Sequence, residues 1–154
     1  MIHVERLFLS PGHNYFGHHD RPAGAHPILE VDQVECVAGR GLQGDRFFNH
    51  KQDYKGQITF FAAEVFEQMC AALGLPEADP AALRRNVLVR GADLAAWVGQ
   101  EFSIQGIQFA GTEECRPCYW MNQALHHETA EHWLKGRGGL RARILTNGTL
   151  RREI

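Results

Sequence analysis

Cys115 and Cys118, which stand three residues apart, are the residues of this sequence with the clearest potential for chemistry. Arg116 and Pro117 lie between them. A neighbouring guanidinium favours the thiolate, which is the form of cysteine that attacks electrophiles and binds metals. The proline ring fixes the backbone immediately before Cys118 and helps to hold its sulfur in one place. The segment therefore predicts a thiol that takes part in chemistry.

This spacing leaves three kinds of thiol chemistry open. A Cys-x-x-Cys pair can form half of a zinc site whose other ligands are histidines. It can be a dithiol redox couple, although the βαβ unit that surrounds thioredoxin-like motifs is missing here. It can also contain one nucleophilic or metal-ligating thiolate, with the second cysteine as a neighbour. A disulfide between Cys115 and Cys118 would switch that chemistry off.

The histidines that a zinc site would require are concentrated in a long loop, residues 10–27. The polar candidates in it are His13, His18, His19 and His26, together with Asp20. Two adjacent histidines cannot easily direct both rings at one ion, and no spacing here matches a known zinc module. Two interpretations stay open: a polar surface loop, and a zinc-stabilised or regulatory binding module that combines these histidines with the cysteine pair.

A glycine-rich segment, residues 39–46, is the first candidate for binding an anion. Three glycines in six residues permit positive φ angles and a close approach between backbone and ligand. Asp45 and Arg46 would lie at the edge of this segment. Its spacing differs from that of a P-loop, because no Gly-Lys-Ser/Thr follows. The segment is therefore either a ligand-binding turn or a simple structural turn.

Two pairs of arginines are further candidates for binding an anion. Arg84 and Arg85 precede a buried strand, where they would either form surface salt bridges or present a fork that matches phosphate geometry. Arg141 and Arg143 alternate with apolar neighbours, so both should project from one face of a strand. Glycine-rich backbone lies beside this second pair, and such a combination can cradle an anion.

The elements that must position these residues are predicted from hydrophobic periodicity and turn signals. Helical periodicity covers residues 62–73, and Asn122 is the predicted N-cap of a second helix, residues 122–135. Gln105-Gly106 and Asn147-Gly148 indicate β-hairpins. Strands are expected at residues 2–9, 29–37, 56–61, 86–89, 100–104, 107–111 and 149–154, and around Arg141 and Arg143. The pattern predicts a mostly β domain with peripheral helices, an α+β fold.

Two local signals add detail to this scheme. The apolar alternation in residues 29–37 slips by one residue between Val31 and Val34, which suggests a β-bulge. Asp79 and Pro80 are typical of the start of a short helical turn, because proline is favoured at the first helical position.

The overall composition limits the class of protein. With 154 residues, of which 44% are apolar and 22% charged, the chain is expected to form one soluble globular domain, residues 1–154. A net charge of −2 argues against nucleic acid as the main partner. No apolar run approaches the ~20 residues of a membrane span. No secretory signal precedes the first strand, so we expect a cytoplasmic protein with reduced thiols.

Five short segments together give the sequence a family resemblance. Over residues 29–150 it resembles the MOSC domain, which is named for the C-terminal domain of molybdenum cofactor sulfurases. The segments that carry the resemblance, in the family's order, are residues 41–46, 57–61, 85–89, 99–104 and 116–118. The N-terminal part, residues 1–28, holds the first strand and the histidine-containing loop, and this loop has no counterpart that we can place.

The resemblance implies a β-barrel-like MOSC fold and binding of the molybdenum cofactor (molybdopterin), a pterin with a dithiolene, a phosphate and an oxo-metal centre. Cys118 occupies the position of the family's key cysteine. In relatives that cysteine is proposed to carry sulfur as a persulfide, or to ligate molybdenum in reductases of N-hydroxylated substrates. Relatives contact the cofactor at the positions of Gly44, Asp45, Arg46, Arg85 and Asn86. We expect Arg116, Arg141 and Arg143 to add positive charge to the same site.

The sequence also departs from the larger members of this family. It contains no sulfurase domain that would supply sulfur, and no appended ferredoxin or other redox domain. Activity as a sulfur transferase or as an oxidoreductase would therefore require a sulfur-donor or redox partner protein.

Overall fold

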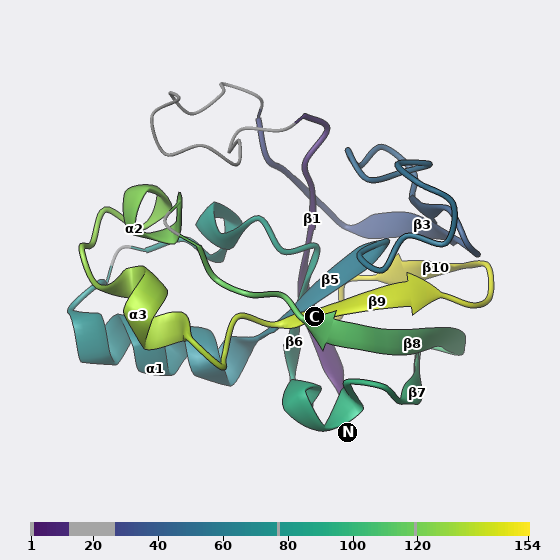
Figure 1. The fold of residues 1–154 in the computed structure, drawn as a ribbon. Coiled ribbons are helices and arrows are strands. Elements are labelled where there is room, and N and C mark those ends of the chain that lie inside the picture. Colours follow the sequence, from purple (N-terminus) through teal and green to yellow (C-terminus); the bar gives the residue numbers. More distant parts are fainter. Residues whose placement is uncertain (1, 13–26, 77, 119) are drawn as a thin grey trace.

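The structure, a computed structural model, describes residues 2–12, 27–76, 78–118 and 120–154. Its strands form two β-sheets, and its three α-helices gather on one side of the larger sheet, away from the smaller one (Figure 1). The predicted α+β fold with peripheral helices is therefore confirmed. The loop residues considered as zinc ligands lie outside the described residues; they are His13, His18, His19, His26 and Asp20.

The larger sheet has seven strands, and most neighbouring strands in it run antiparallel. In spatial order they are β2 (Leu29–Val31), β1 (His3–Leu9), β6 (Val87–Arg90), β5 (Ile58–Ala62), β9 (Leu140–Ile144), β8 (Ile107–Glu114) and β7 (Glu101–Ile104). The central strands β5 and β6 run parallel. Strands β2 and β7 stand at the two edges and do not pair with each other in the described part of the chain, so the sheet is open.

The smaller sheet and the helices complete the fold. The smaller sheet has the order β10 (Gly148–Arg151), β3 (Gln33–Val37) and β4 (Gly41–Leu42). The helices are α1 (Ala63–Leu73), α2 (Trp120–Ala124) and α3 (Ala130–Leu134), with 3₁₀ turns η1 (Pro80–Leu83) and η2 (Leu94–Trp97). None of the helices in the described residues is long and apolar enough to cross a bilayer.

Adjacent residues of β5 separate the apolar core into two halves, because side chains alternate between the faces of a strand. Phe60 packs in a cluster that joins both sheets, together with Phe109 and Leu150. Phe61 points the other way and packs with Met69 and other residues of the helical layer. The larger sheet is thus covered on one face by helices and on the other by the smaller sheet.

Local sequence signals explain several element boundaries. Helix α1 ends where Gly74 adopts a left-handed conformation, with φ of 66°, which glycine accepts without steric cost. The side chain of Asp79 accepts a hydrogen bond from the backbone N–H of Ala81 and so begins η1. The β7–β8 hairpin turns at Gln105-Gly106, both with positive φ, as in a type I′ turn.

The irregular strand at residues 29–37 is two strands in different sheets. β2 pairs with β1 in the larger sheet, and β3 pairs with β10 and β4 in the smaller one. Asp32 lies between them. The slip in apolar alternation, which we interpreted as a bulge, therefore marks the residue at which the chain passes from one sheet to the other.

The single helix predicted at residues 122–135 is wrong. The segment contains two short helices, α2 and α3, and His126 between them has a positive φ of 52°. Asn122 lies inside α2, and its side-chain oxygen accepts a hydrogen bond of 2.7 Å from the backbone N–H of Glu131. It therefore serves the first turn of α3, since the first backbone N–H groups of a helix need acceptors from outside it.

The β-hairpin predicted at Asn147-Gly148 is also wrong. The two strands that flank this turn belong to different sheets, because β9 lies in the larger sheet and β10 pairs with β3. The side chain of Asn147 accepts a hydrogen bond of 2.7 Å from the backbone N–H of Ala38. The turn therefore helps to connect the two sheets.

Candidate functional site

Strand β8 changes the face to which its residues point shortly before the cysteine pair. Phe109 lies in the apolar core, and strict alternation would send Glu113 and Cys115 to the same side. The register with β9 shifts between Gly111 and Glu113, as at a β-bulge. Glu113 then stands opposite Arg141, and the Cys115 thiol is a hydrogen-bonding partner of the Arg141 side chain. The bulge turns this thiol from the core toward a charged site.

The backbone of Cys115 is held from several directions. Its N–H donates to the carbonyl of Gly139 at 2.8 Å, and its carbonyl accepts from Nη2 of Arg85 at 3.0 Å. A Cβ atom added to Gly138 would lie 2.2 Å from the Cys115 carbonyl oxygen and 2.9 Å from Cδ of Pro117. Only glycine allows this approach, so residues 115–117 are fixed against the segment that leads into β9.

Two guanidinium groups carry the positive charge around the Cys115 thiol. Burial alone would lower the pKa of Arg141, but interactions with Cys115, Tyr54 and Glu113 together outweigh it, and the pKa lies above its usual value. Burial lowers the pKa of Arg46, although attraction to Asp45 and to Cys115 opposes the shift. Cys115 is itself only 6% exposed. Two guanidinium groups therefore stand beside a sulfur that is largely shielded from solvent.

An aromatic group forms one wall of this arrangement. Tyr54 interacts with both Arg46 and Arg141. Its ring lies 5.3 Å from that of Phe47 and 4.9 Å from that of His50, measured between centroids. The guanidinium of Arg46 also stacks over Phe47 at 4.4 Å. We call the group of Arg46, Tyr54, Glu113, Cys115 and Arg141 the thiol cluster.

A buried polar network lies beside the thiol cluster and fixes the glycine-rich turn. The side-chain oxygen of Asn86 accepts from the N–H and the hydroxyl of Thr59, both at 3.0 Å. Its amide nitrogen donates to the carbonyl of Phe8 and to Oδ1 of Asp45, both at 3.2 Å. Oδ1 of Asp45 also accepts from the N–H of Ser10 at 2.9 Å. The amide of Asn86 thereby uses its two donors and both lone pairs of its oxygen inside the protein.

Arg85 acts as a clamp in this structure. Its Nε donates to the carbonyl of Gly138 at 2.9 Å, its Nη1 to that of Leu83 at 2.9 Å, and its Nη2 to that of Cys115. Arg85 therefore forms no exposed salt bridge with the residues that the structure describes, and its guanidinium is not a fork left free for phosphate. Because a guanidinium has five N–H groups, two of them are not used in these bonds. Contact between Arg85 or Asn86 and a cofactor stays a prediction.

The other candidate anion ligands surround this region at different depths. Gly44 has a positive φ of 90°, and the following Asp45 and Arg46 are turned inward. Arg143 lies on the same face of β9 as Arg141 and pairs with Asp53 at 2.9 Å, which confirms the predicted alternation of this strand. Arg116 is exposed on the loop after β8.

Cys118 differs from Cys115 in its surroundings. It is exposed, and its carbonyl accepts a backbone hydrogen bond of 2.9 Å from Met121 at the start of α2. The exposed sulfur is accessible to another molecule at the surface. Within the described residues, the structure contains no group of three or more His, Cys, Asp or Glu side chains that could hold a metal ion.

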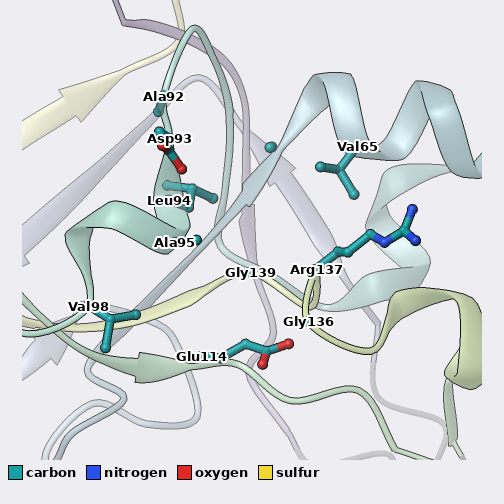
Figure 2. A pocket seen from close by; sticks show the side chains of 11 residues that line it. Val65, Ala92, Asp93, Leu94, Ala95, Val98, Glu114, Gly136, Arg137 and Gly139 are labelled. Carbon is teal, nitrogen blue, oxygen red and sulfur yellow. The ribbon is translucent and has the colours of Figure 1, made fainter.

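A cavity of about 360 Å³ lies on the opposite side of β8 from the thiol cluster. Figure 2 shows Glu114, from β8, and Arg137, from the segment before β9, on its wall, with Val98 and Leu94 as apolar neighbours. One carboxylate oxygen of Glu114 accepts a hydrogen bond of 3.1 Å from the N–H of Gly138. Glu114 and Cys115 are therefore consecutive residues whose side chains point to opposite faces of the sheet.

Sequence reasoning did not identify Tyr54 and Glu113 as members of the thiol cluster. It named Cys115 as part of the cysteine pair, but the direction of the Cys115 side chain depends on the bulge in β8. Tyr54 lies in a stretch without periodicity or a motif, so no pattern in the sequence indicates its role. The strand register places three residues side by side across the sheet: Thr59 on β5, Arg141 on β9 and Glu113 on β8. The sequence alone does not predict this register.

Comparison with known proteins gives a consistent result for family and fold. The sequence model described as MOSC domain matches residues 43–153. The crystal structure of the YuaD protein from Bacillus subtilis is similar to this chain with a TM-score of 0.74 at 17% identity, over 98% of this chain and 92% of that one. The comparison with curated proteins returned no match.

Two structures of YiiM proteins are also similar. That from Geobacillus stearothermophilus gives a TM-score of 0.70 at 13% identity, over 98% of this chain and 71% of that one. That from Escherichia coli gives 0.63 at 16% identity, over 95% of this chain and 65% of that one. At these identities the likeness establishes a shared fold.

Proposed function

Because the chain belongs to the MOSC domain family, we propose that it binds the molybdenum cofactor and carries sulfur as a persulfide on Cys118. The observation that carries this proposal is that Arg46 and Arg141 both interact with the Cys115 thiol, three residues before Cys118. Family membership supports this class of ligand, and the thiol cluster would supply the positive charge that such a ligand needs.

The residues present fit an anionic cofactor. Guanidinium groups match the geometry of phosphate oxygens, and two of them in a partly buried site attract an anion strongly. Arg46 and Arg141 would hold the anionic part of the cofactor, and Arg116 and Arg143 would add charge at the edge. Gly44 lacks a side chain and would allow close contact with backbone. When bound, the cofactor would supply the metal centre at which sulfur is exchanged.

Cys118 would act at the surface end of this site. An exposed thiol can be reached by a sulfur-donor protein. The thiolate form of Cys118 would attack the outer sulfur of a donor persulfide. The other role implied by the family, ligation of molybdenum by Cys118, has no separate observation that favours it.

Cofactor content after purification tests the proposal. The protein would be purified from a host that produces the cofactor, and molybdenum and released pterin would be measured per chain. We expect both in the wild type. Arg141→Gln should lower their retention about tenfold, because it removes one charge-assisted interaction with an anion. The matched control is Arg90→Gln, since Arg90 is a surface residue that pairs with Glu5 and Glu67.

Two results would contradict the proposal. One is the absence of molybdenum and pterin from the wild type, combined with no binding when the cofactor is added. The other is stoichiometric zinc that is lost in Cys118→Ser, which would instead support the zinc-stabilised or regulatory module. Equal cofactor loss in Arg90→Gln and Arg141→Gln would show that the thiol cluster has no special part in binding.

A further inference from the structure

The two cysteines of the loop combine a fixed thiol with an accessible one. Cys115 is buried, its backbone is held by Gly139 and Arg85, and its sulfur interacts with Arg141. Cys118 is exposed and lies beyond the segment that Gly138 holds in place. A reactant from solution therefore meets Cys118 first, whereas the positive charge that stabilises a sulfur anion surrounds Cys115.

We propose that Cys115 is a second sulfur-carrying residue, which takes the sulfane sulfur from Cys118 and holds it inside the thiol cluster. This inference rests on the proposed function, because it describes how sulfur would pass from the surface of the protein to the anion-binding site. In this proposal both cysteines transfer sulfane sulfur, and Cys115 is a catalytic residue.

The chain length between the two sulfurs permits this transfer. Three residues of extended chain span at most ~10 Å, and a turn brings the ends closer. A persulfide adds a further S–S bond of about 2 Å to the reach of Cys118. The backbone of Cys115 stays in place during the transfer, so the loop from Pro117 onward is the part that moves.

The transfer consists of two displacement steps that balance in atoms and electrons. First, the Cys118 thiolate attacks the outer sulfur of a donor persulfide, R–S–SH, which leaves Cys118–S–SH and the donor thiolate RS⁻. Second, the Cys115 thiolate attacks the outer sulfur of Cys118–S–SH, which leaves Cys115–S–SH and the Cys118 thiolate. Neither step needs an external oxidant or reductant, because one S–S bond breaks as another forms.

The thiol cluster gives the second step its direction. A persulfide on Cys115 that loses its proton becomes an anion beside Arg141 and Arg46, which stabilise it through charge-assisted hydrogen bonds. An anion on Cys118 is exposed to water and to screening by salt. Sulfur should therefore accumulate on the inner residue when no acceptor is present.

Loading with glutathione persulfide tests the relay. The fully reduced protein would be mixed with this donor, sampled over time, alkylated with iodoacetamide and analysed by fragmentation mass spectrometry, which distinguishes the two cysteines. In the wild type we expect the added sulfur on Cys118 at early times and on Cys115 later. In Cys118→Ser the loading of Cys115 should slow about tenfold or more, because the inner thiol is shielded from solvent.

Further variants separate the relay from effects on folding. Cys115→Ser and Cys115→Ala should both load at the wild-type rate on Cys118 and keep the sulfur there. Cys36, in the core, and Cys70, on α1, provide internal reference thiols that should not follow this time course. The wild-type time course needs no substitution, so the relay can be judged even if a variant at the buried Cys115 folds poorly.

The outcomes separate this inference from the proposed function. The relay is overturned if sulfur stays on Cys118 throughout the wild-type time course, or if Cys115 loads equally fast in Cys118→Ser. If Cys118 loads and the cofactor is retained but no transfer occurs, only the relay fails. If Cys118 does not load and the protein retains neither molybdenum nor pterin, the proposed function fails and the relay fails with it.

Discussion

Cys115 and Cys118 belong to one short motif, yet they differ in their burial and in the contacts that hold them. Cys115 is buried and clamped, whereas Cys118 is exposed near the start of α2. The residues that create the difference, Arg85, Gly138 and Arg141, come from distant parts of the sequence. Tertiary contacts therefore give the two cysteines of a symmetric motif different environments.

The largest effect is expected for Arg85→Met, which should make the two thiols more alike. The substitution leaves the carbonyls of Leu83, Gly138 and Cys115 without their donor, so the free energy of unfolding should fall by about 3 kcal/mol. Urea denaturation measures this change. The rate of alkylation of Cys115 should rise toward that of Cys118, because the loop is no longer held to β6.

A surface arginine provides the control for this prediction. Arg90→Gln should change the stability far less, since exposed ion pairs contribute little. The clamp would be refuted if Arg85→Met left the alkylation rate of Cys115 unchanged while the protein remained folded.

A smaller effect is expected for Gly138→Ala. The added methyl group would lie 2.2 Å from the Cys115 carbonyl oxygen, so the loop must move, at a cost of about 2 kcal/mol. Gly136→Ala is the matched control, because nothing lies within 4 Å of its added Cβ and only its positive φ of 79° opposes the change. We expect about 1 kcal/mol for the control. Equal losses of unfolding free energy would show that close packing on Gly138 is unimportant.

The third test uses Cys36, a thiol that is buried without a cation. Burial, with a smaller effect from Glu35, raises the pKa of Cys36 to about 12. The folded pKa thus exceeds the unfolded one of about 8.5. Stability from this thiol is complete below the unfolded pKa and is lost as pH rises toward the folded value, by at most about 1.4 kcal/mol per pH unit.

Urea denaturation of wild type and Cys36→Ala at pH 8 to 11 measures this dependence. We expect the variant to be less stable at pH 8, because it loses buried sulfur, but to show a flatter decline above pH 9. Parallel declines in the two proteins would assign the alkaline slope to other groups.

The smallest effect is expected for Glu113→Gln. A hydrogen bond from Lys55 lowers the pKa of Glu113, with help from Arg141 and Arg116. Its contribution to stability is therefore present above the unfolded pKa and is lost as pH falls through the lower folded pKa. Because this side chain is largely exposed, we expect a change within about 0.5 kcal/mol at pH 7. A much larger change would indicate that Glu113 also orients Arg141.

Elements with strong local signals were predictable from the sequence. Helix α1, its end at Gly74, the Asp79 cap and the β7–β8 hairpin depend on neighbouring residues, and all were confirmed. The turn at Asn147 carries an equally strong local signal, but β10 pairs with β3 in the other sheet and not with β9. Asn122 likewise caps a helix other than the one it was expected to begin.

The candidate site was less predictable for a physical reason. The face of a strand to which Arg141 points follows from alternation, and this was confirmed. The direction of Cys115 follows from a register shift between two strands, which no single strand encodes. The bonds of Arg85 and Asn86 depend on carbonyls and carboxylates that the fold brings from elsewhere.

The register shift in β8 also makes the site sensitive to chain length. Deletion of Glu114, which follows the shift, would bring Cys115 into its place opposite Leu140. Cys115 would then point toward the cavity and away from Arg141. The thiol would survive this deletion with its chemistry intact and its direction reversed. Relatives that keep these residues must therefore keep their count as well as their identity.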